Sequence, residues 1–162
     1  PQRNRRKRRN LRGGCDDERG GVVGFAYGLF LAAATAAAHG VLLIAWRWLF
    51  ILRPPVPDQP EVWIRTFVFW GTVVGMVCVV TAFSWGLACG FAAPVDKNYR
   101  PMRLAWALLF LPALVPSAIG FVVTGFEPLA GIAYLLSAGG VYYLASRLLT
   151  PAVWRYIIPP RL

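Results

Sequence analysis

The chain has 162 residues, of which 57% are hydrophobic, yet its formal net charge is +10. A soluble domain of this size cannot bury so much apolar surface in one core. The charges are also segregated: residues 20–46, 66–94, 104–126 and 128–146 contain no Asp, Glu, Lys or Arg. This pattern excludes an ordinary soluble domain and predicts an integral membrane protein.

The four uncharged runs predict four transmembrane helices, because about 20 apolar residues cross roughly 30 Å of hydrocarbon. We expect an all-α fold with short loops and extended terminal arms. The expected parts are a basic N-terminal arm over 1–20, a four-helix membrane domain over 21–150 and a C-terminal arm over 151–162. Within the membrane domain the spans are expected near 22–48, 66–91, 104–124 and 129–149.

The N-terminal arm begins PQRNRRKRRNLR, which has seven basic residues and no acid. Such a segment is expected to be disordered when it is alone in water. Its charge predicts anchoring on anionic lipid head groups or on a partner subunit, through Arg5, Arg6, Lys7, Arg8, Arg9 and Arg12, with Arg155 in the C-terminal arm. RNA attracts such a patch equally. However, no aromatic residue that could stack on bases precedes Phe25, so nucleic acid is not an expected partner.

Proline and charged residues predict the conformation of the three connections between the spans. LRPPVPDQPE predicts an extended connector, APVDKNYRP a short polar turn, and residues 125–128 a tight helical hairpin. Pro112 and Pro116 predict a kink in the third span, and Glu127 is placed to cap the fourth.

Basic residues also predict the orientation. Four spans place both termini and the loop near residue 100 on one side, which carries 14 Lys and Arg, against three on the other. The positive-inside tendency then directs the termini to the cytoplasm, or to the matrix in mitochondria. The Arg-rich start is typical of mitochondrial targeting sequences, although it is not amphipathic.

The second span contains a stripe of small residues. On a helical wheel they fall within an arc of about 120°, and they are Gly71, Gly75, Cys78, Ala82, Gly86, Cys89, Gly90 and Ala93. We call these eight the glycine stripe. The first span offers a matching small surface at Gly24, Gly28 and Ala32. Because close backbone approach supplies the attraction between helices in lipid, we expect the two spans to pack antiparallel along these surfaces.

Candidate chemistry in the spans is sparse. His39, the sole histidine, falls within the small surface of the first span and is expected to make a buried polar contact with a neighbouring helix. Haem ligation would need a second axial ligand, such as Met76 or Met102, and a proton relay would need acids in the spans. Cys78 and Cys89 are expected as packing residues rather than metal ligands. No catalytic set, metal site, cofactor or small-molecule substrate is predicted, although a bound phospholipid such as cardiolipin is compatible with the arms.

The order of features resembles a known family. A small-residue first span (FLAAATAAAHGV), a proline connector (LRPPVPDQP), a second span with FVFWGTVVGMV and a polar turn (PVDKNYRPM) precede two closely linked spans. This layout resembles the four-helix accessory subunits of mitochondrial respiratory complex I that are related to the inner-membrane translocase (Tim-type) family. The resemblance covers roughly residues 25–148. In that family the termini face the intermembrane space, opposite to the side that the charge count predicts here.

The resemblance implies a non-catalytic structural subunit in the mitochondrial inner membrane, which stabilises a respiratory complex through helix packing and arm contacts. Its expected partners are other membrane subunits and anionic lipids. The alternative is a small transporter or protein-translocation channel that uses the glycine stripe and the third span.

Overall fold

The computed structural model describes residues 2–55, 58–91, 104–106, 108–109 and 111–150. These residues form α-helices, one π-helical segment and connecting turns, with no strand among them. The elements are α1 (Gln2–Leu52), α2 (Pro60–Phe91), α4 (Leu111–Val123), α5 (Pro128–Leu135), η1 (Leu136–Val141) and α6 (Tyr142–Leu149). Four stretches are long and apolar enough to cross a membrane: Gly21–Leu52, Pro60–Gly90, Leu104–Val123 and Pro128–Leu149. The expectation of an all-α protein with four membrane-spanning helices is therefore confirmed.

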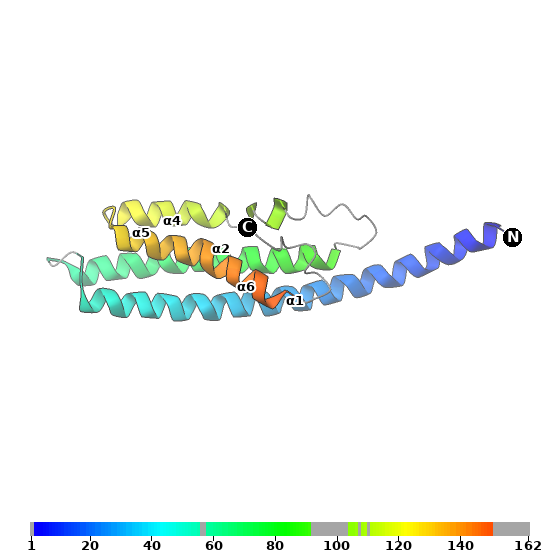
Figure 1. Ribbon diagram of the computed structural model, residues 1–162, viewed down its shortest axis with the longest axis horizontal. Coiled ribbons are helices and arrows are strands. Elements are labelled where there is room, and N and C mark those ends of the chain that lie inside the picture. The colour runs from blue at the N-terminus through cyan, green and yellow to red at the C-terminus, as the bar shows by residue number, and fades with distance from the viewer. Residues whose placement is uncertain (1, 56–57, 92–103, 107, 110, 151–162) are drawn as a thin grey trace.

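The longest helix, α1, runs through the N-terminal arm without a break at residue 20 (Figure 1). The sequence analysis expected an extended arm there, disordered when it is alone in water. The physical reason for the difference is that helix nucleation is already accomplished in the adjoining span, so each further residue adds only a propagation step. Arg, Lys and Leu are also good helix formers. Figure 1 shows this end of α1 extending beyond the other labelled helices.

The connector between the first two spans is shorter than its proline content suggested. Helix α1 continues to Leu52, and α2 already begins at Pro60. Proline is compatible with the first turn of a helix, because the N–H that it lacks would have no partner there. Pro60 therefore starts α2 rather than extending the connector.

The third and fourth spans form a tight hairpin. Gly125 has φ of 78°, and the N–H groups of Gly125 and Phe126 donate to Val122 O and Phe121 O, both at 3.0 Å. This pairing satisfies carbonyls at the end of α4 and suits glycine, which adopts positive φ without strain. Glu127 stands at the N-cap position of α5, but its side chain makes no capping hydrogen bond.

The two prolines of the third span occupy different positions in its helix, and the predicted kink stays a prediction. Residues 104–106 and 108 are helical and Leu109 is a turn, so the regular helix α4 begins only at Leu111. Pro112 falls in the first turn of α4, where proline is tolerated. Pro116 lies buried inside α4, which is helical from Leu111 to Val123.

The fourth span is not one regular α-helix. Its middle is the π-helical segment η1, which contains Gly139 and Gly140. The sequence analysis expected a continuous helix over 129–149. A π-helical turn inserts a residue into the helical repeat and leaves backbone carbonyls with altered partners, and such segments occur often at functional sites.

Many large apolar side chains lie on the outer surface of the bundle. Phe69, Met76, Val80 and Leu148 are examples, each with more than 60% of its surface accessible. Buried positions instead recur at spacings of three and four residues along α2, at Trp63, Phe67, Gly71, Val74, Gly75, Cys78, Ala82, Trp85, Gly86 and Cys89. This is the burial pattern of a helix with one face in the protein interior and the other in lipid.

Candidate functional site: the interface between α1 and α2

Helices α1 and α2 lie side by side and antiparallel and share the most extensive interface of the bundle (Figure 1). At one end their backbones touch. A Cβ atom added at Gly24 would lie 2.5 Å from the Cα of Gly90, and one added at Gly86 would lie 2.5 Å from the backbone N of Gly28. Real Cβ atoms essentially never approach so closely. Any side chain at Gly24 or Gly86 would therefore push the two backbones apart.

The other small residues of the two surfaces are buried. Ala32 is 9% exposed on α1, and Ala82 and Cys89 are each 1% exposed on α2. Gly28 faces the Phe83 carbonyl oxygen, which would lie 2.9 Å from an added Cβ. The structure thus brings together the small surfaces of both spans, with the exception of Ala93, which lies outside the described residues.

At the other end of the interface, glycine makes room for side chains instead of backbone. A Cβ atom at Gly71 would lie 2.6 Å from Leu43 Cδ1, and one at Gly75 would lie 2.5 Å from His39 Nε2. The imidazole of His39 therefore lies directly over Gly75. In this half of the glycine stripe, the missing side chains leave room for Leu43 and His39 of α1.

His39 also makes the polar contact that its position predicted. Its Nε2 lies 2.8 Å from the carbonyl oxygen of Gly71, and the residue is 5% exposed. A carbonyl can only accept, so Nε2 carries the proton and donates it to Gly71. In a neutral imidazole the other nitrogen, Nδ1, is then an acceptor. Nδ1 is buried and has no hydrogen-bond partner within the described part of the chain.

Thr35 lies one helical turn before His39 and is fully buried. Its Oγ1 likewise has no partner among the residues that the structure describes. Residues four apart occupy the same helix face. The first span therefore carries two adjacent buried polar groups, of which the sequence analysis identified only His39.

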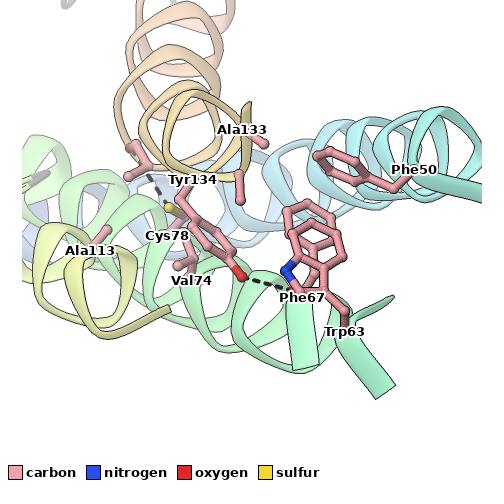
Figure 2. Close-up of a cluster of buried hydrophobic side chains, with 10 residues drawn as sticks. Phe50, Trp63, Phe67, Val74, Cys78, Ala113, Ala133 and Tyr134 are labelled. Carbon is pink, nitrogen blue, oxygen red and sulfur yellow. Dashed lines mark hydrogen bonds between the residues drawn. The ribbon is translucent and has the colours of Figure 1, made fainter. Parts of the chain in front are cut away.

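Cys78 connects the interface to the fourth span. It is fully buried, and its Sγ donates weakly to the carbonyl oxygens of Ser137 and Ala138, at 3.6 and 3.7 Å (Figure 2). Both carbonyls belong to η1. Cys78 is thus a packing residue that also meets the irregular backbone of the π-helical segment.

An aromatic cluster fills the same half of the bundle as Cys78. Figure 2 shows Phe50, Trp63, Phe67 and Tyr134 grouped together, with ring centroids 4.8 Å apart for Phe50 and Trp63 and for Phe50 and Phe67. Two polar atoms fix the cluster to backbone carbonyls. Tyr134 Oη donates to Phe67 O at 3.2 Å, and Trp63 Nε1 donates to Thr124 O at 3.0 Å.

The opposite half of the bundle has its own hydrogen bonds between segments. Tyr27 Oη and Thr150 Oγ1 are 2.8 Å apart, and Trp106 Nε1 donates to Ser146 Oγ at 3.0 Å. Tyr142 Oη donates to Trp106 O at 3.2 Å. These contacts link α1, the start of the third span and α6. Sequence reasoning did not find them, because the partners lie 36 to 123 residues apart and meet only when the helices pack.

The basic anchoring residues predicted from the sequence belong to the two terminal arms. Arg5, Arg6, Lys7, Arg8, Arg9 and Arg12 belong to the N-terminal extension of α1, and Arg155 lies outside the described residues. Their predicted contacts with lipid or partner stay predictions.

The fold and this interface define the class of the molecule, a multi-pass α-helical membrane protein. No protein-family model, curated protein or solved structure matches the chain.

Proposed function

We propose that this protein is a non-catalytic structural subunit of a larger membrane complex, and that its place is a respiratory-chain assembly of the mitochondrial inner membrane. The observation that carries the proposal is the backbone contact at Gly24, Gly28, Gly86 and Gly90, which makes the α1–α2 pair a closely packed unit. Close packing of this kind gives a fixed scaffold whose outer surface remains available for other helices.

The filled interior supports the same proposal. The aromatic cluster, Cys78 and the side chains of Leu43 and His39 occupy the space between the helices. The outer face carries large exposed apolar residues, including Phe25, Leu29, Val80 and Ile132. Such a face suits lipid or the helices of partner subunits equally well in a bilayer. The layout of spans and connectors favours the respiratory assembly, and the basic side of the protein favours termini in the matrix.

The alternative, a channel lined by the glycine stripe, has less support. Glycine can line a pore only where the space above it is open. Here that space is taken by backbone at Gly86 and by the His39 imidazole at Gly75. A pore along this stripe would require the two helices to separate.

Native electrophoresis of the full chain, extracted from its own membrane in mild detergent, tests the proposal. We expect it to migrate with a complex many times its own mass of 17.9 kDa and to co-fractionate with respiratory activity. Migration as a small monomer or dimer would contradict the subunit proposal. Co-migration with a complex that lacks respiratory activity would contradict only the placement in the respiratory chain.

A matched pair of variants sharpens this test. Gly86→Ala forces a methyl group into the Gly28 backbone, whereas Gly40→Ala adds the same group where nothing lies within 4 Å. We expect Gly86→Ala to reduce incorporation into the complex and Gly40→Ala to leave it unchanged. Equal incorporation of both variants would show that assembly does not depend on the α1–α2 interface.

A further inference from the structure

A shallow cavity of about 520 Å³ lies where α1 ends and α2 begins. Its lining includes Arg47, Ile51 and Pro54 from the α1 side and Glu61, Ile64 and Arg65 from α2. None of these residues belongs to the glycine interface or to the terminal arms. The cavity is therefore separate from the candidate site described above, and on the charge-based orientation it opens on the side opposite the termini.

The two arginines of the cavity lie at matching depths. Arg47 comes five residues before the end of α1 at Leu52, and Arg65 comes five residues after the start of α2 at Pro60. Each is about 7–8 Å from its helix end. This is the border between hydrocarbon and head groups for a spanning helix, where a long arginine side chain extends its guanidinium toward phosphate.

The charges in the cavity have a distinct pattern. Arg47, Glu61 and Arg65 are exposed, and the structure gives none of them an ion-pair partner among its described residues. Two guanidiniums suit a phosphodiester, because each can donate two parallel hydrogen bonds to phosphate oxygens. One carboxylate suits an ammonium group, which has donors and no acceptor. Ile51 and Ile64 add apolar surface on the bilayer side.

We propose that this cavity binds the head group of phosphatidylethanolamine. Its phosphate contacts Arg47 and Arg65, and its primary ammonium contacts Glu61. The apolar residues Ile51 and Ile64 pack against the glycerol and the first acyl carbons. Charge complementarity distinguishes this lipid from others: phosphatidylglycerol leaves Glu61 without a cation, and the quaternary ammonium of phosphatidylcholine has no N–H to donate to a carboxylate.

Lipid binding to the purified full chain, measured by native mass spectrometry, tests the site. The probes are phosphatidylethanolamine, phosphatidylglycerol and phosphatidylcholine with identical acyl chains. We expect the ethanolamine lipid to bind most tightly to the wild-type protein. The double substitution Arg47→Ala and Arg65→Ala is expected to weaken its binding about ten-fold or more, since each cationic contact with a head group contributes substantially to affinity.

Arg53→Ala is the matched control for charge. Arg53 is exposed at the same end of the bundle but does not line the cavity. We expect this variant to bind phosphatidylethanolamine like the wild type. An equal loss in Arg53→Ala and in the double variant would overturn the site, because it would show diffuse attraction rather than a defined pocket.

Glu61→Gln tests the ammonium contact specifically. It removes the carboxylate charge with little change in shape, so we expect the preference for phosphatidylethanolamine over phosphatidylglycerol to disappear or reverse. An unchanged ratio would overturn the assignment of the head group. Circular dichroism and thermal unfolding of each variant verify that the bundle is intact, so that a loss of binding reports on the cavity.

The same experiment distinguishes the lipid from two other possible ligands of the cavity, a free anion and an acidic protein segment. Displacement of the lipid by inorganic phosphate at millimolar concentration would indicate a free-anion site and overturn the lipid proposal. Loss of a co-purifying protein from the double variant, with lipid binding unchanged, would indicate an acidic partner segment and overturn it as well. Lipid binding at this cavity does not depend on the proposed subunit role. A negative result in these binding experiments would therefore leave that role unaffected.

Discussion

The Nε2 atom of His39 lies 2.8 Å from the carbonyl oxygen of Gly71, and the same imidazole fills the space in which a side chain at Gly75 would stand. His39 on α1 thus contacts two glycines on α2, and its ring accounts for the absence of a side chain at Gly75. The hydrogen bond satisfies a donor that would otherwise be buried without a partner, which is costly in a low-dielectric interior.

This relationship predicts coupling between His39 and Gly75. Gly75→Ala in the wild-type protein is expected to destabilise the bundle by about 1–3 kcal/mol, as overpacking does in well-filled interiors. In a His39→Ala background the methyl group meets empty space, so Gly75→Ala should cost at least about 1 kcal/mol less. A double-mutant cycle measured by reversible unfolding in detergent checks this, and additive costs would show that the two residues do not touch.

The backbone contact predicts that alanine substitution changes the free energy of unfolding very differently at Gly86 and at Gly40. We expect Gly86→Ala to lower the free energy of unfolding by about 1–3 kcal/mol, because the methyl group would meet the backbone of Gly28, which cannot move like a flexible side chain. Gly40→Ala should be neutral or stabilising by up to about 1 kcal/mol, since alanine favours a helix and the space is open. Unfolding of both variants in the same detergent provides the comparison, and a tolerant Gly86 would contradict the close approach.

The hydrogen bond of the Trp63 indole is expected to contribute to the free energy of unfolding. Trp63→Phe keeps an aromatic ring in the cluster but removes the Nε1 donor to Thr124 O. We expect a loss of about 0.5–1.5 kcal/mol in unfolding free energy, the usual net contribution of one hydrogen bond. Trp70→Phe serves as a control for ring size, because the structure gives its indole no hydrogen bond to a described residue. Equal losses in both variants would assign the effect to packing alone.

Burial predicts the reactivity of two cysteines. Cys78 is 0% exposed and Cys89 is 1% exposed, and neither forms a disulfide. In a Cys15→Ser variant, we expect no labelling by maleimide in the folded protein and two labels after unfolding in SDS. Rapid labelling before unfolding would show that the interface between α2 and its neighbours opens readily.

Cys15 predicts the side of the membrane on which the N-terminal arm lies. The charge count predicts that this arm lies on the more basic, inner side. With the mitochondrial location proposed above, a membrane-impermeant maleimide should leave Cys15 unmodified in sealed mitochondria or mitoplasts and modify it once the membrane is permeabilised. Labelling in intact mitoplasts would place the arm in the intermembrane space and reverse the orientation.

The sequence alone determined the class of fold. Four uncharged runs of the length of a spanning helix favour helix, because a helix pairs the N–H and C=O groups in lipid within its own segment. The small residues at positions 24, 28, 86 and 90 also indicated which helix faces approach, because only glycine and alanine allow backbones to come so close. Composition and helical period carry that information without any tertiary structure.

Only the tertiary structure decided what each small residue faces. A helical wheel treats Gly75 and Gly86 alike, yet one lies under an imidazole and the other against a backbone. The π-helical segment η1, the Trp63 contact with Thr124, and the joint presence of Arg47, Glu61 and Arg65 in one cavity were equally invisible in the sequence. These features depend on the rotation and register of one helix against another. Those are set by the sum of many weak packing contacts across the bundle rather than by the pattern of any single span.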